Sequence, residues 1–217
     1  MKYYFDIEQR TDEWFAIKWG KIGGTKAKEL FINSDTLFYK ILAQHVEEFD
    51  EDADEGYASF AMERGNELEP IALEELSRYT GHNFISIGWI QSDHEMLGIS
   101  PDGITEDCTI QAEIKCPQAI NHLKMVLSDE IPVEYVNQCV HAFTVNSKLE
   151  KLFFCSYRPE NELKPMFVKE VTRDSMVNNG TVARPVMELV SDLVYRSVEE
   201  ADKLQAKIKE TIESLKF

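Results

Sequence analysis

Hydrophobic and polar residues alternate over residues 109–115, with the period of two that is typical of a β-strand. The alternation places Glu113 and Lys115 on the same face of this strand, roughly 7 Å apart at their backbones. Two later runs, Lys151–Tyr157 and Met166–Val171, also have the composition of strands and are separated by a short polar turn. We expect these two strands to extend the sheet that carries Glu113.

Other segments have hydrophobic residues at helical spacing. Residues 25–44 predict two helices broken around Asn33–Asp35, and residues 59–80 predict a helical region closed by Gly81. Pro70 marks either a kink or the first turn of a new helix. Strands and helices that follow one another in this way predict an α/β fold.

The C-terminal residues 186–215 form a long amphipathic pattern. We expect a helix whose hydrophobic side packs on the sheet. The alternative is that this side contacts another subunit or a partner protein. No Pro-, Gly- or Ser-rich linker divides the 217 residues, of which 43% are hydrophobic, so we expect a single domain over residues 1–217.

The run Ser100–Gly103 brings a second carboxylate to the strand at residues 109–115. Asp102 lies in a Pro-Asp-Gly turn, and a short strand, Met96–Ile99, comes before it. A hairpin-like return would bring Asp102 beside Glu113, which follows eleven residues later. The sequence therefore predicts two acids and one amine at a single place.

This set of groups has a recognisable chemistry. Mg²⁺ is held in proteins by one or two carboxylates, together with waters and phosphate oxygens of the substrate. Asp102 and Glu113 supply this minimum, and the Lys115 amine is placed to orient a water or to stabilise charge on a phosphate. The pattern indicates metal-dependent cleavage of a phosphodiester. The alternative is an ordinary turn followed by a strand with a solvated polar face.

Ser100–Gly103 together with Glu113–Pro117 resembles the core motif of the PD-(D/E)XK nucleases, and within them the branch of phage lambda exonuclease and the YqaJ-type viral recombinases. The resemblance runs from about Arg10 to about Tyr157. Three further motifs of this branch fall in the right order: an N-terminal DNA-contacting segment with Trp14 and Lys18–Thr25, an Arg-Gly helix motif at Arg64–Glu69, and a glutamine-bearing helix at Tyr135–Gln138.

The resemblance implies a restriction-endonuclease-like α/β fold in which helices flank a central mixed sheet. It implies a Mg²⁺-dependent exonuclease, for which Mn²⁺ can substitute, that degrades one strand of linear double-stranded DNA. The implied direction is 5′ to 3′, and the product is single-stranded DNA for phage-type recombination. A ring-shaped trimer and a single-strand annealing partner are also implied. Two alternatives stay open: an endonuclease of the restriction or repair type, and a catalytically silent DNA-binding or phage interaction protein.

The resemblance also assigns roles to individual residues. Asp102 and Glu113 hold the metal, with the backbone carbonyl of Ile114 as an extra ligand, and Glu69 supports a second metal or its waters. Gln138 positions the nucleophile or the phosphate. The expected catalytic set is Asp102, Glu113, Lys115, Glu69 and Gln138, and the residues expected to contact DNA are Lys18, Thr25, Arg64, Ser100 and Trp14.

Two positions depart from the lambda-type pattern. Six residues past Lys115, where lambda-type enzymes carry an Arg that helps to grip the terminal 5′-phosphate, the chain has Asn121, with His122 and Lys124 nearby. Lys18 stands in place of an Arg, which keeps the charge and loses the bidentate phosphate geometry. We therefore expect weak discrimination between phosphorylated and hydroxyl ends, unless another basic residue substitutes.

The overall charge opposes binding to a polyanion, because 23 Lys and Arg stand against 39 Asp and Glu, a net charge of −16. Local arrangement has to overcome this repulsion. Seven acids fall within residues 47–55, where we expect a solvated loop; imitation of nucleic-acid phosphate is the alternative. For Trp14 and Trp19 we expect core packing, with stacking on an unpaired base as the alternative.

Hydropathy and cysteine spacing set the remaining expectations. No hydrophobic run approaches the length that crosses a bilayer, and the first residues lack the apolar stretch of a signal peptide. A cytoplasmic location, in a bacterium or a bacterial host cell, is expected. The four cysteines form no Cys-x-x-Cys pair, so we expect free thiols.

Overall fold

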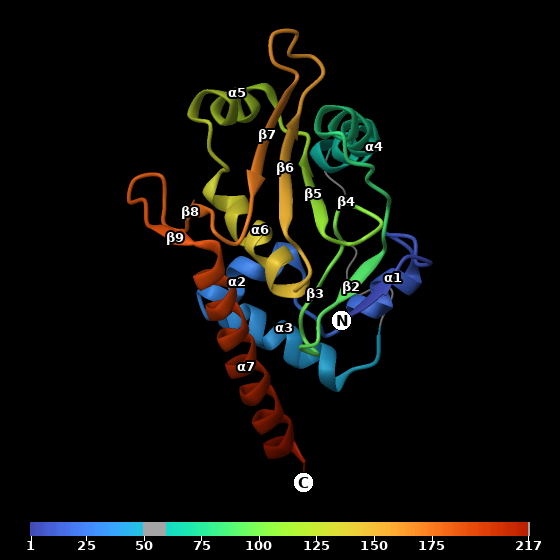
Figure 1. Ribbon diagram of the computed structural model, residues 1–217. Helices are drawn as coiled ribbons and strands as arrows, with labels where there is room; N and C mark the ends of the chain where they lie inside the picture. Colours follow the sequence, from blue (N-terminus) through green and yellow to red (C-terminus); the bar gives the residue numbers. More distant parts are fainter. Residues whose placement is uncertain (50–59, 217) are drawn as a thin grey trace.

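The computed structural model describes residues 1–49 and 60–216, and a four-stranded mixed sheet lies at its centre (Figure 1). Its strands, in spatial order, are β4 (Gly103–Ile104), β5 (Ile110–Lys115), β6 (Lys151–Tyr157) and β7 (Met166–Val171). β5 and β6 run parallel, whereas β4–β5 and β6–β7 are antiparallel. The prediction that the last two strands extend the sheet of Glu113 is confirmed.

Helices cover both faces of this sheet. Parallel strands need a crossover connection, and between β5 and β6 it consists of α5 (Ala119–Ser128) and α6 (Val133–Val145). α4 (Phe60–Thr80) packs on one face, where Ala72 joins Ile114 in a hydrophobic cluster. α6 packs on the opposite face and belongs to the main core. The predicted α/β architecture, a mixed sheet flanked by helices, is confirmed.

The polar face of β5 is buried as well as the hydrophobic one. Gln111 is 1% exposed and Glu113 is 2% exposed. Helix α6 lies on this side of the sheet, so the polar side chains of β5 are withdrawn from water. The alternative of an ordinary solvated strand face is therefore wrong.

Helix α4 continues through Pro70, so this proline does not begin a new helix. The helix ends before Gly81, as predicted. Gly81 has a φ of 74°, and its N–H donates to the carbonyl of Ser77 at 2.9 Å. Arg64 and Glu69 lie on this single helix, on the N-terminal side of the proline.

The N-terminal region folds into short helices. They are α1 (Asp12–Lys18), the 3₁₀ helix η1 (Gly24–Lys26), α2 (Ala27–Phe31) and α3 (Asp35–Val46). The predicted break around Asn33–Asp35 is confirmed. Ser34 caps α3, because its hydroxyl accepts a hydrogen bond from the Leu37 N–H at 3.3 Å. Most of the acidic run at 47–55 lies outside the described residues.

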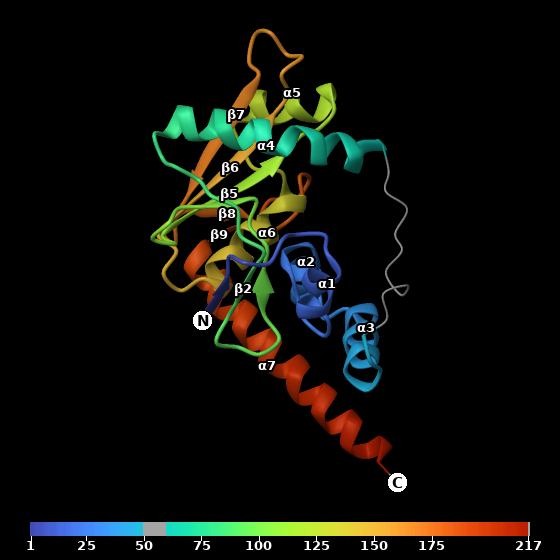
Figure 2. The same cartoon turned by 90° about the vertical axis from the view of Figure 1, so that its right-hand side faces the viewer.

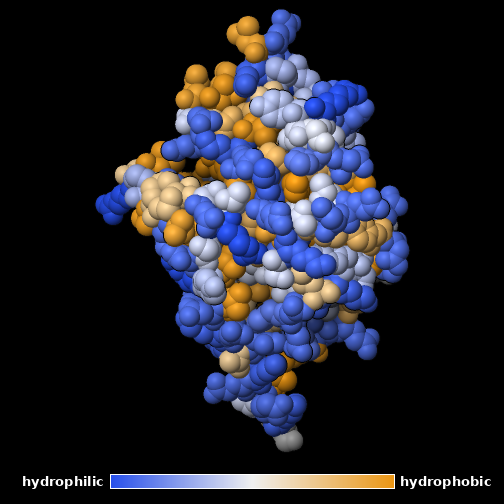
Figure 3. Space-filling model, viewed as in Figure 1, coloured by the Kyte–Doolittle hydropathy of each residue, from blue (hydrophilic) through white to orange (hydrophobic). Residues whose placement is uncertain are grey.

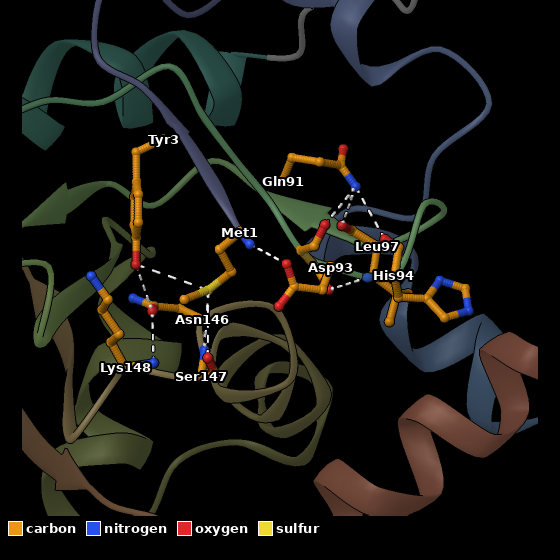
Figure 4. A network of polar contacts seen from close by, with 10 residues as sticks. Met1, Tyr3, Gln91, Asp93, His94, Leu97, Asn146, Ser147 and Lys148 are labelled. Atoms are coloured by element: carbon orange, nitrogen blue, oxygen red, sulfur yellow. Dashed lines mark hydrogen bonds and ion pairs between the residues drawn. The ribbon is translucent and has the colours of Figure 1, made fainter.

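A second, three-stranded sheet contains the N-terminal strand, which the hydropathy pattern did not reveal. It consists of β1 (Lys2–Tyr4), β2 (Trp89–Gln91) and β3 (Gly98–Ile99), all antiparallel. The predicted strand at 96–99 is therefore shorter than expected. Figure 4 shows how Asn146 ties this sheet to the end of α6: its side-chain oxygen accepts from the Tyr3 hydroxyl at 3.0 Å. The amide of Gln91 donates to the carbonyl of Leu97 at 2.9 Å and closes the β2–β3 turn.

The C-terminal helix α7 (Val190–Leu215) packs on other helices and not on the sheet (Figure 2). It contacts α6, α2 and α3, and its side chains Leu193 and Ile208 are buried in the main core. The expectation that it covers the sheet is wrong because α6 already occupies that face. A two-stranded hairpin, β8 (Met176–Asn178) and β9 (Met187–Leu189), precedes it.

Hydrophobic side chains also remain on the surface. Figure 3 shows them gathered on the upper part of one face, over α5 and the β8–β9 hairpin. Leu127, Val182 and Met187 are among the exposed residues of these elements. The four cysteines are free thiols. Within residues 1–49 and 60–216, no helix has both the length and the apolar composition that a membrane span needs.

Candidate active site

The register between β4 and β5 brings the two predicted acids together. Gly103 pairs with Ala112, so the preceding Asp102 lies beside Glu113. One Asp102 oxygen accepts a hydrogen bond from the N–H of Ile114 at 2.5 Å. Lys115 donates from Nζ to Glu113 Oε1 at 2.5 Å. The predicted hairpin-like return is confirmed, and all three functional groups meet at the end of β5.

The electrostatics of this cluster favour a cation. Burial, and then the neighbouring Glu113 carboxylate, raise the pKa of Asp102 well above its usual value. Burial alone would lower the pKa of the Lys115 ammonium, but Glu113 and Asp102 outweigh that effect and raise it. Lys115 is thus the positive charge that balances two crowded carboxylates. A divalent cation at this position would relieve the remaining repulsion.

Glu69 approaches the same cluster from α4. Burial raises the pKa of its carboxyl, and the nearby Arg10 opposes the rise. Arg10 Nη2 lies 3.4 Å from a side-chain oxygen of Glu69. The backbone of Arg10 is in the left-handed region, with a φ of 70°. The charges of Glu113 and Lys115 also act on Glu69. The structure therefore places a third acid at the edge of the site, as predicted, with Arg10 as a partner that the sequence did not indicate.

These donors suit a hard divalent cation. In the described part of the chain, no three acidic, His or Cys side chains are grouped closely enough to form a metal cage by themselves. Mg²⁺ does not require such a cage, because waters and substrate phosphate complete its octahedral shell. Asp102, Glu113 and the carbonyl of Ile114 are oxygen donors at one end of β5, and they fit this incomplete type of site.

A cleft of about 910 Å³ opens on one side of the acids. We call it the N-terminal cleft, and its lining includes Lys18, Thr25, Ser100, Asp102, Lys115 and Gln138. Gly24 allows Gln138 to come this close: a Cβ built on Gly24 would lie 3.1 Å from Gln138 Cγ. The structure thus brings four of the predicted binding and positioning residues to the cleft that Asp102 lines.

Trp14 also lines this cleft, and most of its side chain is buried. The indole is 9% exposed, and its N–H donates to the Ser100 hydroxyl at 2.8 Å. The Lys18 ammonium lies 3.1 Å from the centre of the indole ring. The alternative that Trp14 stacks on an unpaired base is therefore wrong for this conformation, because the indole ring is buried and the Lys18 ammonium lies on its face.

A second cleft, of about 730 Å³, opens on the other side of Lys115. We call it the arginine cleft, and its lining includes Arg64, Asn66, Glu69, Lys115, Asn121, Tyr135 and Arg158. Arg64 donates to the carbonyl of Cys116 at 2.8 Å and to both oxygens of Glu160 at 2.9 and 2.8 Å. Lys115 and Asn66 line both clefts, so the two clefts meet at these residues.

The comparisons with known proteins agree with this geometry. A family model described as the YqaJ-like viral recombinase domain matches residues 13–148, more than half of the chain. The chain belongs to this family. The resemblance to lambda-type PD-(D/E)XK nucleases that the motifs indicated is confirmed. No curated protein matches the sequence.

Solved structures share the fold of this YqaJ-like chain. An alkaline exonuclease, LHK-Exo, from Laribacter hongkongensis superposes with a TM-score of 0.76 at 23% identity, over 95% of this chain and 96% of the other. Its complex with dAMP gives 0.72 at 24% identity, over the same shares of the two chains. A phage-related exonuclease from Haemophilus somnus 129PT gives 0.60 at 12% identity, over 90% of this chain and 96% of the other. At these identities the likeness establishes the fold.

Two other residues, Tyr135 and Gln9, complete the site of the YqaJ-like chain, and His122 lies outside it. The ring of Tyr135 lies 5.2 Å from Lys115 Nζ, and burial raises the pKa of its hydroxyl. Gln9 donates to the carbonyl of Pro101 at 3.1 Å and so holds the residue before Asp102. His122 does not face a substrate: it is fully buried and bonds to the Ser156 hydroxyl at 2.8 Å. No spacing rule could have revealed Gln9, because it reaches the site from the other end of the chain.

Proposed function

We propose that this protein is a Mg²⁺-dependent DNA exonuclease, able to use Mn²⁺, that degrades one strand of linear double-stranded DNA. We further propose 5′ to 3′ degradation that exposes single-stranded DNA for phage-type recombination. The observation that carries the proposal is the meeting of Asp102, Glu113 and Lys115 at the junction of two clefts. Membership of the YqaJ-like family and a fold shared with solved exonucleases support it.

Asp102 and Glu113 are the residues that would hold the metal, with the carbonyl of Ile114. When bound, a divalent cation neutralises charge that develops on the phosphate and lowers the pKa of the attacking water. The Ile114 N–H fixes the Asp102 carboxylate in place. Glu69 lines the same cleft as Lys115 and is the residue that would support a second cation or its waters.

Lys115 would stabilise charge on the reacting phosphate. Its raised pKa keeps the amine protonated at neutral pH, so it acts first as a positive charge and a hydrogen-bond donor. The ammonium points toward Glu113 and lines both clefts. From this position it can reach a phosphate that enters from either side.

The N-terminal cleft would hold the end of the substrate strand. Lys18 and Thr25 supply an ammonium and a hydroxyl for phosphate oxygens, and Ser100 and Gln138 supply further donors. Trp14 would support Lys18 and Ser100. LHK-Exo, which shares the fold, has been solved with dAMP, a nucleoside monophosphate of the kind that stepwise degradation releases.

One digestion tests the proposal. End-labelled linear duplex is incubated with the protein in Mg²⁺ and in chelator, next to covalently closed circular duplex. We expect mononucleotide release from linear DNA in Mg²⁺ only, and intact circles. Cleavage of the circles would identify an endonuclease instead. Binding to DNA without cleavage in any divalent cation would identify a catalytically silent DNA-binding protein.

The partners implied by the resemblance belong to the same proposal. A ring-shaped trimer and a single-strand annealing protein both require an exposed contact surface. The exposed hydrophobic residues of α5 and the β8–β9 hairpin, such as Leu127 and Met187, supply one. A cytoplasmic location also stays a prediction.

A further inference from the structure

Two arginines in the arginine cleft share one carboxylate. Arg64 comes from α4, and Arg158 follows β6 directly. Both oxygens of Glu160 accept from Arg64 Nη2, at 2.9 and 2.8 Å, and Arg158 Nε lies 3.9 Å from one of them. Two guanidinium groups thus stand against a single carboxylate. The cluster carries one excess positive charge on a chain whose net charge is −16.

The two guanidinium groups are anchored, whereas the carboxylate is not. Arg64 donates to the carbonyl of Cys116 at 2.8 Å, and Arg158 donates to the carbonyl of Pro117 at 3.1 Å. Their side chains are 17% and 20% exposed, but that of Glu160 is 54% exposed. Glu160 belongs to the turn between β6 and β7. This turn is at the top of the molecule in Figures 1 and 2. It can move into solvent while the arginines keep their positions.

A substrate strand that crosses the catalytic cluster has to reach these arginines. The N-terminal cleft and the arginine cleft meet at Lys115 and Asn66. Arg64 bonds to the residue directly after Lys115. A DNA strand carries a phosphate on every nucleotide, so a strand with its scissile phosphate at Lys115 and its end in the N-terminal cleft places a neighbouring phosphate in the arginine cleft.

Guanidinium groups suit that phosphate. Their planar donors pair with carboxylate and phosphate in the same two-pronged geometry. Glu160 takes both of its hydrogen bonds from one nitrogen of Arg64, Nη2, and so occupies a donor that a phosphate oxygen could use. The hydrogen bond from Arg64 lowers the pKa of the Glu160 carboxyl, so this occupant is charged at neutral pH and competes with DNA.

We propose that Arg64 and Arg158 form a second phosphate subsite, for the phosphodiester on the far side of the scissile bond from the N-terminal cleft, and that Glu160 is an internal carboxylate which this phosphate displaces. The inference rests on the proposed function, since it needs a DNA strand at Lys115. According to this inference, Glu160 lowers the affinity of the protein for DNA.

Affinity for DNA, measured without cleavage, tests this inference. A labelled linear duplex is titrated with wild type and variants, with Ca²⁺ in place of Mg²⁺, at several salt concentrations. Glu160→Gln should bind about threefold to tenfold more tightly, because the phosphate no longer displaces a charged competitor. Arg158→Gln should bind about tenfold more weakly, and its salt slope should fall by about one.

Glu162→Gln is the matched control. Glu162 is exposed in the same turn, and its substitution removes the same charge. It should change the affinity by less than about twofold, as expected for an exposed charge in salt. Equal effects of Glu160→Gln and Glu162→Gln would mean that each variant only lowers the general charge repulsion between the protein and DNA. That outcome would overturn the proposed subsite.

Two further outcomes would overturn the inference. Unchanged affinity in Arg158→Gln would show that no phosphate is bound there. A lower kcat in Glu160→Gln at unchanged affinity would make Glu160 a residue that positions the end of β5. Failure of the proposed function is distinguishable, because the wild type would then release no mononucleotides from linear duplex in Mg²⁺, whether or not it binds duplex ends. Thermal unfolding of each variant confirms that the fold is retained.

Discussion

Asp102, Glu113 and Lys115 lie within 14 residues of the sequence, whereas Lys18, Thr25, Ser100 and Gln138 reach the N-terminal cleft from four separate segments. The catalytic cluster depends on one antiparallel pairing, Gly103 with Ala112, which sets its geometry locally. The cleft depends on how α1, η1 and α6 pack on the sheets. The residues proposed for the chemical step are thus close together in the sequence, whereas those proposed to bind the substrate come from distant segments.

The two regions also differ in their solvation. Glu113 is 2% exposed, and its charge is balanced by Lys115. In the N-terminal cleft, Thr25 is exposed and Lys18 is half-buried. Substitutions in the buried cluster should therefore act on the chemical step, and substitutions in the cleft on substrate binding.

Glu113→Gln and Asp102→Asn should each abolish cleavage, with losses of at least about 10²-fold to 10³-fold in kcat. Each substitution removes a formal charge from the metal site at nearly constant shape. The measurement is the rate of release from end-labelled duplex at saturating DNA and Mg²⁺. Near-normal cleavage by both variants would show that these residues do not hold the metal and that the buried cluster does not govern the chemical step.

Unfolding serves as the control for these variants. The folded-state pKa of Asp102 is raised, so the folded protein holds this proton more tightly than the unfolded chain. Stability of the metal-free wild type should therefore fall as the pH rises through that pKa. Asn has no proton to lose, so Asp102→Asn removes this loss of stability. The variant should have a higher midpoint temperature of unfolding than the wild type at neutral pH without metal. Mg²⁺ should stabilise the wild type and not the variant.

Lys115→Ala should lower kcat by about 10²-fold, the range expected when a positioned proton-transfer or charge-stabilising group is lost. Binding of metal and DNA should largely survive, because the carboxylates and the cleft remain. Single-turnover cleavage and DNA titration separate the two effects. A variant that bound poorly but cleaved normally at saturation would make Lys115 a binding residue only.

Lys18→Ala should raise KM for duplex ends by about threefold to tenfold with little change in kcat, and reduce the salt slope of binding by about one. The matched control is Lys28→Ala, since Lys28 is exposed on α2 and is not among the residues that line the N-terminal cleft. A large fall in kcat for Lys18→Ala would show that the cleft and the catalytic cluster are not separable.

Asn121→Arg should have the smallest effect, a modest increase in the preference for 5′-phosphorylated over hydroxyl ends. Asn121 is exposed on α5 and lines the arginine cleft, where Arg64 and Arg158 already supply guanidinium groups. Initial rates on the two kinds of blunt duplex, at one salt concentration, measure the preference. A strong preference in the wild type that the substitution leaves unchanged would show that the pocket for the end phosphate lies elsewhere.

The catalytic cluster could be predicted because its information is local. A period of two along β5 places Glu113 and Lys115 together, and a turn returns Asp102 beside them. The strands β6 and β7 and the break between α2 and α3 were likewise predicted from short patterns. Each of these features needs only neighbouring residues and the geometry of the backbone.

The surroundings of the cluster could not be predicted in the same way. Nothing near Glu113 in the sequence indicates that α6 buries its face, or that Gln9 and Arg10 reach the site from the turn between β1 and α1. Helix α7 has an amphipathic pattern that fits any hydrophobic partner, and only the packing shows that the partner is a layer of helices.

The sequence by itself determined the candidate catalytic groups of this protein: two carboxylates and an ammonium on adjoining backbone, which the period of two and the turn bring together. The tertiary structure decided the rest. It buried Glu113, covered Trp14 with Lys18, and joined Arg64 to Glu160 across 96 residues. The reason is physical, because spacing along a strand sets the direction of a side chain, whereas its solvation and charge partners depend on segments that meet only when the core forms.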